Sequence, residues 1–312
     1  MLRLSRSMLF VPASRPEMIE KAARSAADAV CLDLEDAVAP DLKATSRIHV
    51  IEALHRLDFG GRLRMVRINA LDTPLAYRDV IEVVEAAGEY IDLLMLPKTQ
   101  GARDVQFLDT LLTQVEGYKG LKRPIRIEAQ IETAVAFLYL REIAQSSPRL
   151  DALIFGPGDY AASMHMPLAV IGMADTHDTG YPGHRWHAVM HAIVAAARAN
   201  GIRCLDGPYA DFRDADGLAQ ACRQAVALGF DGKQCIHPAQ LATVNQLFAP
   251  TTAELIWARA VVAAYEAATA AGQGAITLEG KMIDAANVRM AQTVLQRQQA
   301  IEAKKKTESD GN

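Results

Sequence analysis

Cysteine is scarce in this chain. Its 312 residues include four cysteines, which occur singly at Cys31, Cys204, Cys222 and Cys235. Three of them lie in or beside predicted strands and helices, where a free cysteine behaves as a small apolar residue. Because disulfide frameworks belong to oxidising compartments, this pattern indicates core residues of a protein in a reducing compartment.

The chain also has no large excess of positive or negative charge. The formal net charge is −4, and phosphate binding requires a basic surface, so no nucleic acid is expected as the main partner. No stretch approaches the ~20 apolar residues of a membrane helix, so we expect no membrane contact. The arginine-rich start resembles a targeting peptide, but its SMLFVPA run is too short for a secretory apolar region and is typical of a strand. We therefore expect a cytoplasmic location.

Several common cofactor and metal motifs are missing. No GxGxxG follows a predicted strand, and GKM and GKQ lack the upstream glycine of a phosphate loop. His184, His187 and His191 include a helical i, i+4 pair, but the glutamate of HExxH is absent. We interpret these histidines as the polar face of a surface helix.

Strand and helix patterns alternate along the chain, and half of its residues are hydrophobic. Eight strands are predicted, at residues 7–12, 29–35, 62–69, 91–98, 124–132, 150–157, 203–208 and 232–238. Eight amphipathic segments follow them, at residues 18–26, 43–57, 75–87, 105–115, 134–143, 186–199, 215–228 and 239–248. Eight alternating pairs predict an α/β fold, a (β/α)8 TIM barrel, rather than an open sheet.

Three further segments complete the predicted organisation. The barrel takes residues 1–249, and residues 250–302 form a C-terminal helical extension. Residues 303–312 are a polar tail that we expect to be disordered. The connection 160–184 is longer than is usual in α/β units, and a long loop at the carboxyl ends of barrel strands is often a lid.

Glu132 and Asp159 are the strongest candidates for a functional site. Glu132 closes the alternating run PIRIEAQIE, and Asp159 closes the apolar run LDALIFGPGD. Two such strand ends side by side would bring both carboxylates to one rim of the barrel, where α/β barrels bind metals and substrates. Carboxylate oxygens with positions left for water suit Mg2+. The pair therefore predicts a metal-dependent enzyme.

Ionisable and polar residues also end most of the other predicted strands. They are Asp33, Glu35, Asp36, Arg67, Asn69, Lys98, Asp206 and His237. A barrel mouth lined in this way carries excess carboxylate, and a divalent cation together with Arg67 would relieve the repulsion. Lys98 has two interpretations, because a lysine at a strand end can form a Schiff base or can pair with nearby acids. We favour the charge partner.

Segments that contain these residues resemble one family. In order between about residues 6 and 300 they are RSMLFVPASRPEMIEKAARSAADAVCLDLEDAVAPDLK, VRINALDTP, LPK, AQIET, FGPGDYAASM, DGPYADF and GKQCIHPAQ. They are similar to the CoA-ester lyases of the citrate lyase beta subunit and HpcH/HpaI aldolase superfamily, and in particular to its malyl-CoA lyase branch. The resemblance implies a Mg2+-dependent barrel, with Mn2+ as a possible substitute. It implies reversible retro-Claisen cleavage of a 3-hydroxyacyl-CoA to a CoA thioester and a small 2-oxo acid, without an organic cofactor.

The resemblance also assigns roles to individual residues. Glu132 of AQIET and Asp159 of GPGDY match the metal ligands, and Arg67 of VRIN matches the arginine that faces the thioester oxygen. Asp284 of GKMID matches an acid/base that reaches into the active site of a neighbouring subunit. The family therefore implies a homo-oligomer, a trimer or a hexamer.

Two further groups of residues concern substrate binding. Phe10, Arg15 and Lys21 match positions that bind the adenine and phosphates of CoA. Pro157 and Gly158 stand where related lyases often have a small residue pair, and they flank the pocket for the acid product. Backbone N–H groups of this FGPGD turn are suited to a carboxylate.

The choice of substrate stays open at the level of sequence. The 2-oxo acid is glyoxylate, with acetyl-CoA or propionyl-CoA as its partner, or it is pyruvate, which would make the chain a citramalyl-CoA lyase. A malyl-CoA thioesterase is a further variant. A citrate lyase beta subunit dependent on an acyl carrier protein, and a class II aldolase acting on free acids, are alternatives that would not need the CoA-binding residues.

Overall fold

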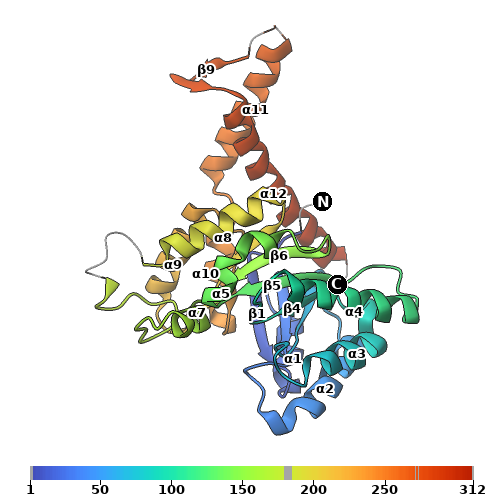
Figure 1. Cartoon of the computed structure of the whole chain (residues 1–312). Coiled ribbons are helices and arrows are strands. Elements are labelled where there is room, and N and C mark those ends of the chain that lie inside the picture. The colour runs from blue at the N-terminus through green and yellow to red at the C-terminus, as the bar shows by residue number, and fades with distance from the viewer. Residues whose placement is uncertain (1–2, 179–184, 271, 273, 311–312) are drawn as a thin grey trace. The chain divides into compact units, whose positions relative to one another are not determined.

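The computed structural model describes residues 3–178, 185–270, 272 and 274–310 (Figure 1). The chain divides into two compact units, Ser5–Asn245 and a C-terminal unit that begins at Gln246. The sequence placed this boundary at residue 249. Each unit has its own hydrophobic core.

The first unit is a closed barrel of eight parallel strands in sequential order, which confirms the predicted (β/α)8 fold. Closure is made by β1, which pairs with β2 on one side and with β8 on the other. The strands are β1 (Ser7–Pro12), β2 (Ala29–Asp33), β3 (Leu63–Arg67), β4 (Leu93–Leu96), β5 (Arg126–Ile131), β6 (Leu150–Phe155), β7 (Arg203–Asp206) and β8 (Gly232–Cys235).

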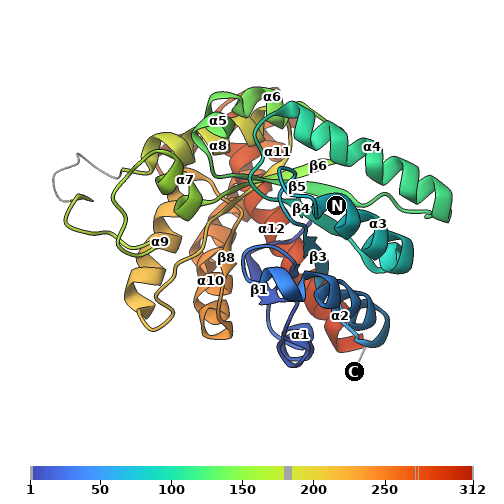
Figure 2. The ribbon, with the colours of Figure 1, turned by 60° about the horizontal axis from the view of Figure 1, so that its bottom comes forward.

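Helices surround the strands of this unit, as Figure 2 shows. They are α1 (Pro16–Ala23), α2 (Lys43–Arg56), α3 (Ala76–Ala87), α4 (Ala102–Lys119), α5 (Ala134–Leu138), α6 (Leu140–Ala144), α7 (Pro157–Ser163), α8 (His187–Ala199), α9 (Ala215–Leu228) and α10 (Leu241–Leu247). Short 3-10 turns cover Pro40–Leu42, Gly88–Tyr90 and Pro238–Gln240. The predicted helix 134–143 is two short helices that meet at Tyr139.

The barrel interior is apolar below the mouth. Side chains alternate between the two faces of a strand, so every second residue of each strand points into the barrel. The buried interior cluster consists of Met8, Ala29, Cys31, Met65, Leu93, Met95, Ala152, Ile154 and Leu205. The next residues of the same alternation, two positions further along each strand, include Phe10, Asp33 and Arg67, so the packed layer supports the residues of the predicted site.

A buried charged cluster lies toward the amino ends of the strands. Nη2 of Arg203 lies 2.6 Å from Oε1 of Glu128, and the guanidinium also contacts Asp151 and the hydroxyl of Ser5. Close packing here depends on Gly232, because a Cβ on it would lie 1.8 Å from the carbonyl oxygen of Ser5. This end of the barrel is closed by ion pairs and backbone contact.

The C-terminal unit is a pair of helices joined by a β-hairpin. Its elements are α11 (Thr252–Ala270), β9 (Ile276–Leu278), β10 (Lys281–Ile283) and α12 (Ala285–Asp310). The hairpin turns at Glu279 and Gly280, which have φ of 49° and 76°, as a two-residue type I′ turn requires. Val261 packs with Ile283 and Ala291 in a small core between the helices.

Two sequence expectations about loops and tails are corrected. The tail was predicted to be disordered from residue 303, but α12 continues to Asp310. The segment AKKKTE consists mostly of residues that favour a helix, so it continues helix α12. The long connection was predicted to begin at residue 160, but residues 160–163 belong to α7. Residues 179–184, with His184, lie outside the described part.

Among the described residues, one helical stretch is long and apolar enough to cross a membrane, by length and composition alone: Pro238–Ala270. This stretch is interrupted at residues 248–251, around Pro250, so it is not one continuous helix. The apolar character of α11 comes largely from alanine, and Ala258 and Val261 are buried in the small core. The absence of membrane contact remains a prediction from the sequence.

Replacing Gly232 by alanine should destabilise the barrel by about 3 kcal/mol or more, because the new methyl group would meet backbone that cannot rotate away. Gly117 in α4 provides the matched control, since a Cβ there meets nothing within 4 Å. Gly117→Ala should stabilise the protein by about 0.5–1 kcal/mol. Urea unfolding followed by circular dichroism measures both. Equal midpoints for the two variants would contradict the packing described for Gly232.

Candidate functional site

A cavity of about 250 Å³ opens at the carboxyl ends of the barrel strands. It brings together seven of the residues that the sequence singled out: Phe10, Asp33, Arg67, Glu132, Pro157, Gly158 and Asp159. Phe10, Asp33 and Arg67 belong to β1, β2 and β3, Glu132 directly follows β5, and the last three belong to the start of α7. The barrel mouth is therefore the candidate active site.

Arg67 is held by two carboxylates at the end of β3. Its Nε and Nη2 atoms donate to the two oxygens of Asp33 at 2.7 and 2.6 Å, and Nη1 lies 2.9 Å from Oε2 of Glu35. The guanidinium also lies over the ring of Phe10, 5.0 Å from its centroid. Burial opposes the charge, but the Coulomb attraction and hydrogen bonds of Asp33 outweigh it and raise the pKa of Arg67. Arg67 is thus a fixed, permanently charged donor.

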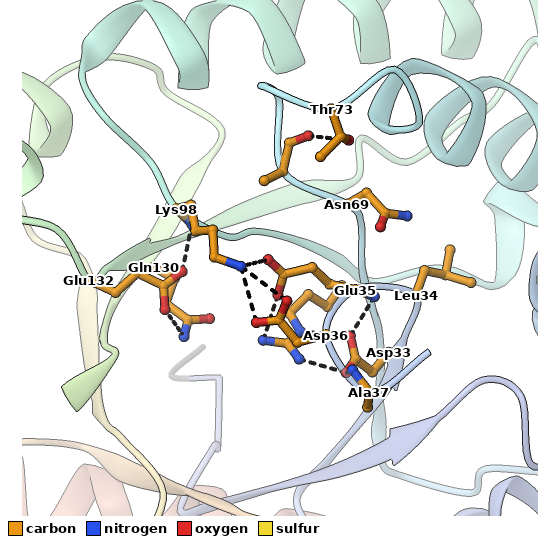
Figure 3. A network of polar contacts seen from close by, with 12 residues as sticks. Asp33, Leu34, Glu35, Asp36, Ala37, Asn69, Thr73, Lys98, Gln130 and Glu132 are labelled. Atoms are coloured by element: carbon orange, nitrogen blue, oxygen red, sulfur yellow. Dashed lines mark hydrogen bonds and ion pairs between the residues drawn. The ribbon is translucent and has the colours of Figure 1, made fainter. Parts of the chain in front are cut away.

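Lys98 connects the acidic residues through both its side chain and its backbone. Its Nζ donates to Glu35 at 2.7 Å and to Asp36 at 3.1 Å, as Figure 3 shows. Its N–H donates to Oε1 of Glu132 at 2.6 Å, with the backbone in the left-handed region at φ 46°. Burial opposes the charge of Lys98, but its contacts with Glu35 outweigh burial and raise the pKa. A protonated amine is no nucleophile, so the charge-partner interpretation is confirmed and the Schiff-base one is not supported.

Glu132 is almost fully buried immediately after β5. Oε1 accepts the N–H of Lys98, and Oε2 accepts Nε2 of Gln130 at 2.7 Å. Burial raises the pKa of Glu132 to about 8, with repulsion from Asp159 and Glu35 in the same direction and the Lys98 hydrogen bond opposing it. The carboxylate therefore lacks sufficient positive charge from the protein around it.

The sequence predicted that Asp159 ends a strand, but in the structure Asp159 belongs to a helix. β6 ends at Phe155, and Asp159 lies exposed in the first turn of α7. The prediction was wrong because Pro157, which breaks an apolar strand pattern, here occupies the first turn of a helix, where proline is well tolerated. The carboxylate still reaches the same cavity as Glu132.

The two carboxylates fit a hard divalent cation. Within the described residues, no group of three or more His, Cys, Asp or Glu is placed to bind a metal. Mg2+, however, is commonly held by one or two carboxylates, with waters and substrate completing its shell. Gly156 keeps space open beside Glu132, because a Cβ there would lie 2.5 Å from Oε2. The raised pKa of Glu132 indicates a place where positive charge would be stabilised.

Comparison with known proteins agrees with this geometry. The sequence pattern of the HpcH/HpaI aldolase/citrate lyase family matches residues 6–238. The chain belongs to this family. It is therefore an enzyme of the carbon–carbon lyase class.

Curated relatives of this lyase match over nearly its whole length. It is 46% identical to the L-malyl-CoA/beta-methylmalyl-CoA lyase of Rhodobacter capsulatus over 94% of both chains. It is 43% identical to the enzyme of the same name from Cereibacter sphaeroides strain ATCC 17025 over 96% of both chains. Among solved structures, protein CitE from Mycobacterium tuberculosis in complex with magnesium, acetoacetate and coenzyme A has a TM-score of 0.73 and 31% identity. That match covers 95% of this chain and 99% of the other.

Other predicted residues of the lyase lie outside the cavity. Arg15 is exposed just before α1, where it pairs loosely with Glu17 at 3.8 Å, and Lys21 is exposed in the last turn of α1. Neither is buried by the barrel, so both are accessible to a ligand from outside. In the C-terminal unit, Oδ1 of Asp284 accepts the N–H groups of Ala286 and Asn287 at the start of α12.

Three of the predicted strand-end residues have structural partners. Asp206 accepts a 2.5 Å hydrogen bond from buried Lys233, and His237 caps the 3-10 turn at Pro238–Gln240. Asn69 donates to Asp79 at 2.8 and 2.6 Å. None of the three lines the cavity at the barrel mouth, so a structural role at the rim holds for them.

Some residues of this site were missed from the sequence. Nζ of buried Lys43 donates to the carbonyl oxygens of Leu34 and Glu35 at 2.7 and 2.6 Å, which fixes the loop that carries Glu35. Nothing in the sequence marks Lys43 as more than a helix-surface lysine. Gln130 could have been found, because it lies two residues before Glu132 and strand alternation places both on one face.

The raised pKa of Glu132 predicts a pH effect on the stability of the metal-free lyase. Its pKa of about 8 lies above the ordinary 4.5, so between these values the folded chain binds more protons than the unfolded chain. The free energy of unfolding therefore falls as pH rises through this window, by up to on the order of 4 kcal/mol. The glutamine in Glu132→Gln cannot ionise, so this variant should lose less free energy of unfolding over the same pH range.

Urea unfolding of both proteins with EDTA at pH 6 and pH 9 measures this difference. Mg2+ added at pH 9 should recover part of the loss in the wild type and little in Glu132→Gln. Equal losses with pH in the two proteins would show that Glu132 is not protonated in the folded chain near neutral pH.

Proposed function

We propose that this lyase cleaves malyl-CoA, and β-methylmalyl-CoA, reversibly to glyoxylate and acetyl-CoA or propionyl-CoA, with Mg2+ as its metal. The observation that carries the proposal is that Arg67, Glu132 and Asp159 line one cavity. Arg67 offers a fixed cation, and Glu132 and Asp159 offer two carboxylates suited to a metal. The relatives at 43–46% identity have the same named activity.

Metal and carboxylates would act at the acid end of the substrate. A divalent cation held by Glu132 and Asp159 would act as a Lewis acid toward the substrate hydroxyl and carboxylate. Lys98 and Gln130 hold Glu132 through one hydrogen bond to each of its oxygens, which fixes the direction of the carboxylate. Each oxygen keeps a second lone pair for coordination.

Arg67 would stabilise the acyl end. When the substrate hydroxyl gives its proton to water and its oxygen becomes the carbonyl oxygen of the oxo acid, the bond between the hydroxyl-bearing carbon and its neighbour breaks. The electron pair of that bond moves toward the thioester oxygen, which becomes an enolate oxygen. Two of the five N–H groups of Arg67 donate to Asp33, and Nη1 forms an ion pair with Glu35 at 2.9 Å, so N–H groups remain for this oxygen. A preorganised donor of this kind is typically worth ~3 kcal/mol of transition-state stabilisation.

The reaction also requires a proton at the enolate carbon. We assign its delivery to Asp284 of the partner subunit, which makes the active enzyme a homo-oligomer, a trimer or a hexamer. Oδ1 of Asp284 is occupied in capping α12, so the proton would be carried on Oδ2. In the condensation direction the same oxygen would remove a proton from acetyl-CoA.

CoA itself would lie across the rim near α1. Arg15 and Lys21 supply positive charge for its phosphates, and both are exposed. Phe10 supplies an aromatic face, but its ring already lies under the guanidinium of Arg67. A citrate lyase beta subunit that takes its acyl group from a carrier protein, or an aldolase that acts on free acids, would have no use for Arg15 and Lys21.

The direct test is incubation of the purified lyase with malyl-CoA, citramalyl-CoA or β-methylmalyl-CoA, with Mg2+ or with EDTA. We expect Mg2+-dependent release of glyoxylate with a free acetyl-CoA product, and a loss of at least ~100-fold with EDTA. A carbonyl reagent detects the oxo acid and a thiol reagent detects free CoA. Thiol release would reveal a thioesterase, pyruvate release would reveal a citramalyl-CoA lyase, and silence on all three substrates would contradict the proposal.

Mixing two inactive variants tests the origin of the proton. Glu132→Gln removes a metal ligand and Asp284→Asn removes the acid, so each alone should lose at least ~100-fold in kcat. Co-expression should restore about one quarter of the wild-type activity, because in random mixtures a quarter of the sites combine an intact rim with an intact Asp284 of the partner subunit. No recovery in verified mixed oligomers would place the acid within the same chain or elsewhere.

A further inference from the structure

An apolar side chain lies beside the proposed metal ligands. Ile171, from the connection after α7, lines the cavity next to Gly158 and Asp159. Its Cδ1 atom lies 2.8 Å from the point that a Cβ on Gly158 would occupy, and its Cγ1 lies 3.4 Å from that point. Ile171 therefore fills the space that the absence of a side chain at Gly158 leaves open.

Ile171 is fixed in place although it belongs to a long connection. Its carbonyl oxygen accepts the N–H of Ala210 at 2.9 Å, which ties it to the segment after β7. The next residue, Gly172, has φ of 83°, and a Cβ there would lie 2.7 Å from the carbonyl oxygen of Pro208. Only glycine fits this turn, so the backbone at Ile171 is held against the segment at Pro208.

The rest of the connection is held by Arg185. This buried guanidinium donates to the carbonyl of Pro167 at 2.8 Å, and it pairs with Asp175 at 3.0 Å and with Asp178 at 3.1 Å. The contacts join the two flanks of the segment that contains Ile171. The isoleucine is thus presented to the cavity by anchored backbone on both sides.

The two ends of the cavity have different chemistry. Arg67 and Phe10 form the acyl end, where charge develops on the thioester oxygen. The oxo acid would bind at Asp159 and Gly158 in the proposed reaction, and Ile171 lines the same cavity with its Cδ1 beside Gly158. Glyoxylate carries a hydrogen on its carbonyl carbon where pyruvate carries a methyl group, so the available space beside Ile171 can distinguish them.

We propose that Ile171 is a specificity-determining residue that selects glyoxylate over pyruvate by filling the space beside Gly158. The inference rests on the proposed lyase function and deepens it. Cδ1 is the atom nearest to Gly158, and Ile171→Val removes only that methyl group. An apolar pocket discriminates one methyl or methylene group by about 10–200-fold.

The test compares condensation of acetyl-CoA with glyoxylate and with pyruvate. The ratio of kcat/KM for the two oxo acids should narrow by about 10-fold in Ile171→Val and further in Ile171→Ala. Val170→Ala is the matched control, because Val170 is the exposed neighbour and does not line the cavity. The ratio for acetyl-CoA against propionyl-CoA should stay unchanged in all three variants, since Ile171 lies away from the acyl end.

Binding of pyruvate without CoA gives a second readout that does not depend on turnover. Isothermal titration in the presence of Mg2+ should show tighter binding to Ile171→Val than to the wild type and Val170→Ala. An unchanged oxo-acid ratio and unchanged pyruvate binding, in variants that still cleave malyl-CoA, would overturn the role of Ile171 alone. A change confined to propionyl-CoA would also overturn it, whereas a wild type inactive on both oxo acids would overturn the lyase function itself.

Discussion

The close approach of five carboxylates at one barrel mouth is the constraint on which the rest of the site depends. They belong to Asp33, Glu35, Asp36, Glu132 and Asp159. Arg67 and Lys98 pair with the first three, so their positive charge is largely committed there. Glu132 receives hydrogen bonds but no ion pair of its own in the described structure, and its burial, with repulsion from Asp159 and Glu35, raises its pKa. A divalent cation is the simplest addition that balances this arrangement, because it would bind where repulsion between Glu132 and Asp159 is strongest.

The barrel supplies this arrangement through strand alternation and closure. Asp33 and Arg67 lie directly opposite each other in the β2–β3 register, so their fork-shaped contact follows from the pairing of two strands. The apolar interior layer below them is fully buried and keeps the strand ends in position. Lys98 adopts an uncommon left-handed backbone that turns its N–H toward Glu132. Such strain persists only where surrounding contacts hold it, and it is common at functional sites.

The sequence predicted the eight strands, their parallel order and most residues of the mouth, because alternating βα patterns leave few other topologies. Glu132 and Arg67 could be assigned to the rim since they end clear apolar alternations. Asp159 was placed correctly at the mouth but in the wrong element, because proline before it can end a strand or begin a helix. Lys43 and Ile171 could not be found, since their roles depend on contacts made across loops: Lys43 with two carbonyl groups, and Ile171 with a glycine in another segment. The helical tail was missed because a polar composition does not separate a disordered end from the exposed end of a long helix.

Electron paramagnetic resonance of Mn2+ binding tests the central claim of a two-carboxylate metal site most directly, since it counts bound metal without substrate or turnover. We expect one Mn2+ per wild-type chain, and binding at least ~100-fold weaker in both Glu132→Gln and Asp159→Asn, because each variant removes one of two anionic ligands. Glu89→Gln, at an exposed glutamate in the Gly88–Tyr90 turn, should bind as the wild type does. Undiminished Mn2+ binding in both Glu132→Gln and Asp159→Asn would contradict the account and place the metal elsewhere.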